Sequence, residues 1–150
     1  MSTAMDASGP GAKLPKVLVV DDEAGNLFTF QRALRRDFEI LMASSGEEAL
    51  RILAMQEVDV LVADYAMPHM DGRELLKRAR ERHPNIPCIF VTAYAELDSV
   101  RETARQNGVV KVLMKPWDKE TLTHWLNHCA SMNSMRRSVD RLRNVTGSTK

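Results

Sequence analysis

The sequence predicts an α/β fold in which helices cover both faces of a central parallel sheet. Five short apolar runs alternate along the chain with five segments of helical periodicity. The runs are apolar almost without interruption, which is typical of parallel strands that are buried on both faces. Strands are expected at 16–20, 38–43, 58–64, 87–92 and 109–114.

Local signals place the ends of the expected helices. Ser45, followed three residues later by Glu48, is a capping-box pattern that begins the second helix. Pro84 ends the third helix, because the residue before a proline resists the α conformation. Gly108 is suited to closing the fourth helix. The helical segments are 27–34, 44–56, 71–82, 96–108 and 117–130.

The length and composition indicate a small protein that works in water. The chain has 150 residues, enough for one domain with a buried core, and a formal net charge of +1. This charge gives no global attraction to nucleic acid or to an acidic membrane surface. No apolar stretch approaches the roughly 20 residues that span a bilayer. We therefore expect no nucleic-acid or membrane partner.

The two cysteines and the N-terminal segment point to the cytoplasm. Cys88 and Cys129 lie on apolar patterns without metal-ligand spacing, so we expect small core residues in a reducing compartment. Residues 1–13 are small and polar and lack the apolar core of a secretory signal. We expect this segment to be a disordered leader and the protein to be cytoplasmic.

Polar side chains stand where four of the five predicted strands end. These residues are Asp21, Asp22, Asp64, Thr92 and Lys115. The carboxyl ends of parallel strands share one edge of the sheet, and open α/β sheets bind ligands at that edge. Clustered carboxylates repel one another, and Mg²⁺ would relieve that conflict while keeping sites for a phosphate. The pattern predicts a magnesium-assisted phosphoryl-transfer site.

Four motifs, taken together in their order and spacing, resemble a bacterial two-component response-regulator receiver domain of the CheY-like type. They are VLVVDDE at 17–23, VADYAMPHMDG at 62–72, VTAY at 91–94 and LMKPWD at 113–118. The resemblance covers about residues 14–130. It implies a flavodoxin-like (βα)5 three-layer sandwich with strand order 2-1-3-4-5.

The resemblance also implies a role for each site residue. Asp64 would accept the phosphoryl group in a His-to-Asp phosphorelay. Asp22, Asp64 and the backbone carbonyl of Ala66 would bind Mg²⁺ directly, with Asp21 acting mainly through water. Thr92 and Lys115 would contact the phosphoryl oxygens, and Lys115-Pro116 would be a cis peptide. A histidine kinase or histidine phosphotransfer protein would donate the phosphate, and no independent enzymatic turnover is expected.

Two positions depart from the pattern of the family. Receiver domains often carry a switching aromatic residue three positions before the lysine, where this chain has Val112. Tyr94, two residues after the threonine, is our candidate to cover the site instead. Ala66 is small, so its side chain does not position a hydrolytic water.

The sequence leaves two other function classes open. A haloacid-dehalogenase-like phosphatase also uses an aspartyl nucleophile, but it normally has a second aspartate two positions later. Asp21 has Glu23 there and Asp64 has Ala66, which argues against that class. The other class is a receiver-like interaction module that is never phosphorylated. The absence of an aromatic residue at Val112 leaves room for it.

One histidine pair could bind a second metal. His124 and His128 are four residues apart on the last predicted helix, and Glu120 stands one turn earlier. A solvated helix face is the interpretation that we favour, because the sequence provides no further ligand.

The last helix is expected to extend past the domain. The apolar positions from Trp125 through Met132 and Val139 to Leu142 keep a spacing close to a heptad. Residues 131–150 are predicted to be either a frayed basic tail or a helical extension. Such an extension would pair with a second copy or connect to an output domain that this chain does not contain.

Overall fold

The predicted architecture is confirmed. The computed structural model describes residues 13–93 and 96–147. All four strand pairings are parallel, and the order is β2-β1-β3-β4-β5. The strands are β1 (Lys16–Val20), β2 (Glu39–Ala43), β3 (Val60–Asp64), β4 (Cys88–Thr92) and β5 (Lys111–Met114). The helices are α2 (Ala24–Leu34), α3 (Gly46–Met55), α4 (Gly72–Arg82), α5 (Leu97–Gln106) and α6 (Lys119–Gly147).

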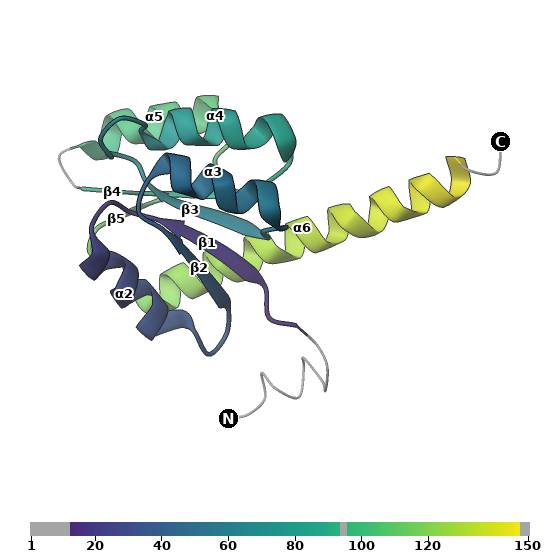
Figure 1. The fold of residues 1–150 in the computed structure, drawn as a ribbon, viewed down its shortest axis with the longest axis horizontal. Helices are drawn as coiled ribbons and strands as arrows, with labels where there is room; N and C mark the ends of the chain where they lie inside the picture. Colours follow the sequence, from purple (N-terminus) through teal and green to yellow (C-terminus); the bar gives the residue numbers. More distant parts are fainter. Residues whose placement is uncertain (1–12, 94–95, 148–150) are drawn as a thin grey trace.

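The sheet separates two apolar cores. Helices α3, α4 and α5 cover one face, and α2 and α6 cover the other (Figure 1). Alternate residues of each central strand enter opposite cores: Leu61 and Ala63 face the first core, whereas Val60 and Val62 face the second. All five residues of β3 and of β4 are buried. This double burial explains the continuous apolar runs and holds the strand ends in fixed positions.

The predicted strands at 58–64 and 109–114 begin two residues too early. Val58 is buried but precedes the strand. The N–H group of Val109 donates to the carbonyl of Ala104 and closes α5. Gly108 adopts a φ of 65°, as a helix-closing glycine does. An apolar run therefore predicts which residues are buried, but it does not predict which of them form hydrogen bonds between strands.

The predicted cap of α3 is confirmed in a modified form. Ser45 Oγ accepts a hydrogen bond from the N–H of Glu48 at 3.1 Å. The Glu48 carboxylate accepts hydrogen bonds from the backbone N–H of Ser44 at 2.7 Å and from its hydroxyl at 3.0 Å. In a standard capping box the acid would instead bond the N–H of the cap residue, Ser45. The two hydrogen bonds from Ser44 lower the pKa of Glu48, and the bond from its backbone N–H has the larger effect.

We expect Glu48→Gln to destabilise the fold at neutral pH by less than about 1 kcal/mol. Because the folded state lowers the pKa of Glu48, its contribution is present above the ordinary value of 4.5. It is lost as the pH falls through the lowered pKa. Urea unfolding of both proteins at neutral and acidic pH should show the difference shrink in acid. Glu47→Gln, which removes a charge from the same turn, is the control and should show a smaller difference at neutral pH.

Gly72, the first residue of α4, has backbone and a ring packed closely against the place of a side chain. A Cβ atom there would lie 3.1 Å from the Cα of Tyr65 and 3.2 Å from the ring of Phe90. We expect Gly72→Ala to cost about 1–3 kcal/mol through overpacking. Gly25→Ala in α2 is the matched control, because a Cβ there meets nothing within 4 Å. It should leave stability unchanged or raise it by up to about 1 kcal/mol. Equal midpoints for the two variants in thermal unfolding would contradict the packing argument.

Helix α6 continues well past the sheet, as predicted. It runs unbroken for 29 residues, about 43 Å at 1.5 Å per residue. Figure 1 shows its second half leaving the body of the domain. None of the helices in the described part of the chain combines the length and the apolar character that crossing a bilayer requires.

Candidate functional site

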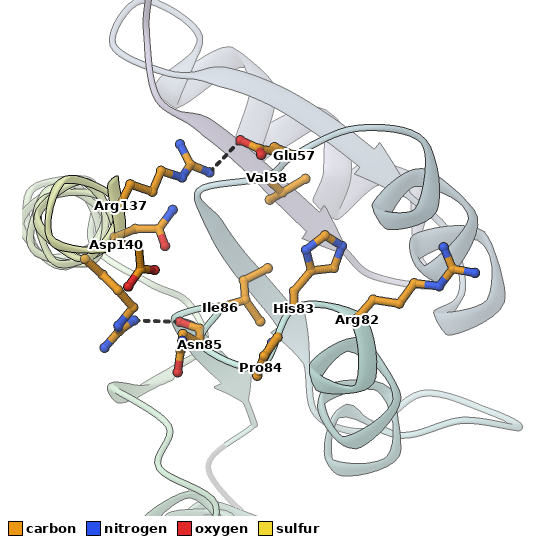
Figure 2. A pocket seen from close by; sticks show the side chains of 11 residues that line it. Glu57, Val58, Arg82, His83, Pro84, Asn85, Ile86, Arg137 and Asp140 are labelled. Atoms are coloured by element: carbon orange, nitrogen blue, oxygen red, sulfur yellow. Dashed lines mark hydrogen bonds and ion pairs between the residues drawn. The ribbon is translucent and has the colours of Figure 1, made fainter. Parts of the chain in front are cut away.

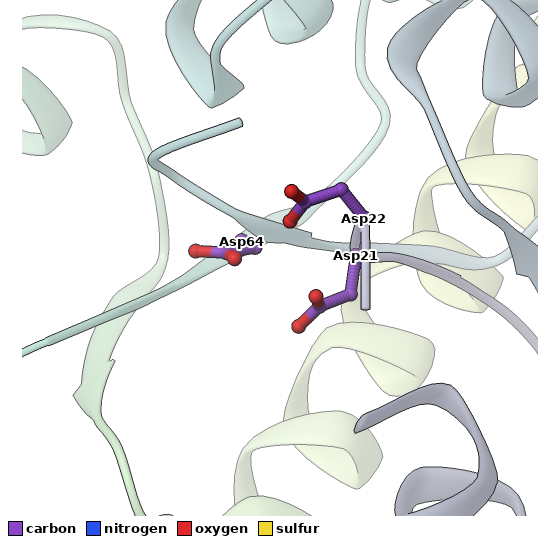
Figure 3. Close-up of side chains that lie close together, drawn as sticks. All are labelled: Asp21, Asp22 and Asp64. Atoms are coloured by element: carbon purple, nitrogen blue, oxygen red, sulfur yellow. The ribbon is translucent and has the colours of Figure 1, made fainter. Parts of the chain in front are cut away.

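Three carboxylates meet at the carboxyl edge of the sheet, where the strand order reverses between β1 and β3. Asp21 and Asp22 follow β1, and Asp64 is the last residue of β3. One carboxylate oxygen from each lies within 4.8 Å of the other two. Figure 3 shows these side chains grouped at the ends of the two strands. Asp21 and Asp64 are buried, whereas Asp22 is exposed. The structure thus brings together the three acids that the sequence placed at strand ends.

The Asp21 carboxylate is held by its own loop. Its Oδ1 accepts the N–H of Glu23 at 2.9 Å, and its Oδ2 accepts the side-chain amide of Asn26 at 3.1 Å. Asn26 also donates to the Glu23 carboxylate at 3.0 Å. Asn26 was not predicted from the sequence as a partner of Asp21. Its place in the first turn of the helix that follows Asp21 was a usable signal, because that turn faces back to the loop.

Lys115 reaches this cluster from the end of β5. Its Nζ donates to Asp64 Oδ2 at 3.0 Å and lies 3.5 Å from Asp21 Oδ2. Burial raises the pKa of Asp64, and the bond from Lys115 offsets only part of this effect. Burial would lower the pKa of Lys115, but the bonds and charges of Asp64 and Asp21 outweigh it and raise the value. Without further positive charge, the site therefore disfavours the ionised form of Asp64.

Thr92 lies near Asp64 on the neighbouring strand β4, and Ala66 follows Asp64 by two residues. Asp64 pairs in register with Val91, the residue before Thr92. Thr92 is fully buried, and its hydroxyl donates to the carbonyl of Ala93 at 3.5 Å. The N–H of Ala66 donates to Asp64 Oδ1 at 3.3 Å. The hydroxyl of Thr92 is therefore near the site but engaged with backbone.

Val112 stands where many receiver domains have a switching aromatic residue, and it is packed within the sheet. Val112 lies in β5 opposite Phe90 and packs against the first apolar core. Tyr94, the predicted substitute, lies outside the described residues. The Lys115-Pro116 peptide bond is cis, as the resemblance implies.

The acidic site fits a magnesium ion. Three carboxylates and one ammonium carry two net negative charges when all are ionised, and a divalent cation balances that charge. Mg²⁺ prefers oxygen ligands and commonly binds one or two carboxylates while keeping several waters. Asp22 is exposed, and within the described part of the chain no hydrogen bond or ion pair occupies its carboxylate. Asp22 and Asp64 are therefore suited to hold the ion.

The histidine pair on α6 is packed against an aromatic ring. His124 and His128 both lie edge-on to Trp125, with ring centroids 5.1 and 5.6 Å away. Among the described residues, the three aspartates are the one group of at least three potential ligands close enough to share a metal ion. The pair is therefore better described as a helix face than as a metal site.

The cysteines are buried in the described structure. Cys88 and Cys129 are both free thiols, and burial raises the pKa of each, that of Cys129 to about 12. Both are therefore small core residues, as the apolar patterns around them predict.

Fold and site together define a class of protein. It is an open parallel α/β domain with an acidic, lysine-containing site at the switch point of the sheet, suited to a divalent cation and a phosphoryl group. The model of the response regulator receiver domain family matches residues 17–127. The chain belongs to this family, whose members act in two-component signal transduction.

Known proteins agree with this assignment. The chain is 32% identical over 130 residues to the hydrogenase transcriptional regulatory protein HoxA of Cupriavidus necator, covering 87% of this chain and 27% of that protein. It is 40% identical over 103 residues to the DNA-binding transcriptional regulator NtrC of Escherichia coli K12, covering 68% and 22%. A receiver domain from Clostridium thermocellum superposes with a TM-score of 0.76 at 30% identity, covering 81% and 98%. The chain thus spans about a quarter of the length of these curated relatives.

Proposed function

We propose that this receiver domain accepts a phosphoryl group on Asp64 from a phosphohistidine of a histidine kinase or histidine phosphotransfer protein. The observation that carries the proposal is the contact of Lys115 Nζ with Asp64 Oδ2 inside a cluster of three carboxylates. Asp22, Asp64 and the Ala66 carbonyl are the proposed ligands of Mg²⁺, and Asp21 acts through water. Bound Mg²⁺ supplies positive charge to the phosphoryl oxygens.

The proposed transfer is a direct displacement at phosphorus. An oxygen of the Asp64 carboxylate forms a bond to phosphorus while the phosphorus–nitrogen bond breaks, and the imidazole leaves with the bonding electrons. Lys115 exchanges its contact with Asp64 for one with a phosphoryl oxygen. The Thr92 hydroxyl turns from the carbonyl of Ala93 to the phosphoryl group. We propose that this movement shifts a two-state equilibrium at the face built by α5, β5 and α6.

Incubation of the full chain with acetyl phosphate and Mg²⁺ tests the proposal. Intact-mass measurement should show the addition of one phosphoryl group, and chelation of Mg²⁺ should prevent it. Borohydride reduction followed by peptide mapping should place the modification on Asp64. An unchanged mass, or a phosphoryl group on another residue, would contradict the proposal.

The two rival functions give different results in the same assay. A phosphatase would release phosphate from a small phosphoester over many turnovers, whereas a receiver should show no such turnover. An interaction module that is never phosphorylated would bind no phosphoryl group and would not respond to beryllofluoride, a phosphoryl mimic.

We further propose residues 14–130 as the receiver unit and 131–150 as a helical extension that meets a second copy or an output module. Met135 and Val139, spaced four residues apart on α6, are 70% and 46% exposed, which supports a contact role. Light scattering with and without beryllofluoride tests the pairing with a second copy.

We also propose a cytoplasmic location, which the two buried free thiols favour. The proposed leader, 1–13, lies almost entirely outside the described residues.

A further inference from the structure

A polar cluster ties α6 to the amino edge of the sheet, opposite the acidic site. Asp59, one residue before β3, stands at its centre. Asp59 Oδ1 lies 2.9 Å from Arg137 Nη1 and accepts a hydrogen bond from the Asn133 side-chain amide at 3.3 Å. Asp59 Oδ2 accepts the backbone N–H of Lys16 at 2.8 Å. One carboxylate thus connects the starts of β1 and β3 to two successive turns of α6.

Two outer contacts extend the cluster to neighbouring loops. Arg137 Nη2 lies 3.2 Å from the Glu57 carboxylate, and Arg136 Nη1 donates to the backbone carbonyl of Asn85 at 2.9 Å. Figure 2 shows α6 beside these loops, with Arg137 directed at Glu57. Both residues line a groove of about 210 Å³. Helix α6 is therefore held by the loop before β3 and by the loop before β4.

Apolar packing does not account for this attachment. Leu122, Leu126 and Cys129 are fully buried and anchor the first half of α6. Among the described side chains from 131 to 143, Asn133 is the one buried residue. The 13 helical residues from 131 to 143 are exposed to water on most sides, and a helix of that length is only marginally stable by itself. The polar contacts at Asn133, Arg136 and Arg137 therefore hold the two turns that follow the last core residue.

We propose that Asp59, Asn133 and Arg137 form a latch that fixes the direction in which α6 leaves the domain. With the latch closed, residues 138–147 are a rigid arm in line with the anchored part of the helix, and they are not a flexible tether. Any partner that contacts the arm then meets the receiver domain in one orientation. This inference is independent of phosphorylation at Asp64, because the latch lies at the other end of β3.

Hydrogen exchange measured by mass spectrometry on the full chain tests the latch. In the unmodified protein, amides of residues 131–143 should be protected. Arg137→Ala should speed their exchange on the order of fivefold. This factor corresponds to the upper end of the stabilisation that an exposed ion pair provides. Arg141→Ala is the matched control, because Arg141 contacts only the nearby Ser138 among the described hydrogen bonds and ion pairs. It should leave exchange in 131–137 unchanged.

The same samples show whether each variant is folded, since peptides from β3 and β4 should keep their protection. Unprotected amides after Ala130 in the unmodified protein would overturn the proposal. Equal exchange in Arg137→Ala and the unmodified protein would also overturn it.

A distance measurement tests the rigidity of the arm directly. Cys88 and Cys129 are buried, so spin labels can be directed to cysteines introduced at the exposed positions Arg51 and Arg141. The labelled protein should give one narrow distance distribution, and adding Asn133→Ala with Arg137→Ala should broaden it. A broad distribution before the latch is broken, or an equally narrow one afterwards, would show that the latch does not orient α6.

Discussion

Asp64→Asn is expected to take up no phosphoryl group from acetyl phosphate in the presence of Mg²⁺. An amide lacks the ionised oxygen that attacks phosphorus, and its weaker oxygen donor also lowers the affinity of the site for Mg²⁺. The loss should be complete in intact-mass measurements. Calorimetric titration with Mg²⁺ should show affinity reduced by at least about tenfold, since even indirect partners of a metal ion contribute that much.

The fold of this variant should survive. Burial and the charge of Asp21 disfavour the ionised Asp64 in the absence of a cation, and they raise its pKa. An uncharged amide removes that conflict, so Asp64→Asn should unfold no earlier than the unmodified protein in Mg²⁺-free buffer. Asp37→Asn, at an exposed turn between α2 and β2, is the control and should take up a phosphoryl group as the unsubstituted protein does. Phosphate uptake by Asp64→Asn would show that another residue is the acceptor.

The acidic site was predictable because it depends on chain order and burial alone. Each apolar run had to be a buried parallel strand, and parallel strands place their carboxyl ends at one edge. Asp21, Asp22, Asp64 and Lys115 follow such runs directly, so their meeting required no knowledge of side-chain conformation. The starts of the strands were less certain, since Val58 is as apolar as its neighbours in β3 while its backbone lies outside the ladder.

The latch was not predictable by the same means. Asp59 and Asn133 are 74 residues apart, and neither stands in a repeating pattern. Their contact depends on where a long helix passes after its last core residue. The basic residues after Ala130 could equally have belonged to a frayed tail. The burial of Leu122 and Leu126 brings the first half of α6 past the amino edge of the sheet, and only there does Arg137 come within reach of Asp59 and Glu57.

Lys115→Met is expected to slow phosphoryl uptake by about 10²–10³-fold at saturating Mg²⁺, the usual effect of removing one group that stabilises charge in a transition state. Methionine keeps the apolar part of the side chain but leaves the phosphoryl oxygens without the ammonium. The affinity of the site for Mg²⁺ should instead rise. The ammonium of Lys115 lies 3.0 Å from Asp64 and 3.5 Å from Asp21, so it competes with Mg²⁺ for these two carboxylates. Removing the ammonium ends that competition.

Opposite changes in the two measurements separate a chemical role for Lys115 from general damage to the site. A distorted site would lose both phosphoryl uptake and Mg²⁺ binding. Lys77→Met, on the exposed face of α4, removes the same charge away from the site and should change neither. An unchanged uptake rate in Lys115→Met would mean that the contact between Lys115 and Asp64 serves the resting structure alone, because the transition state would not need the ammonium.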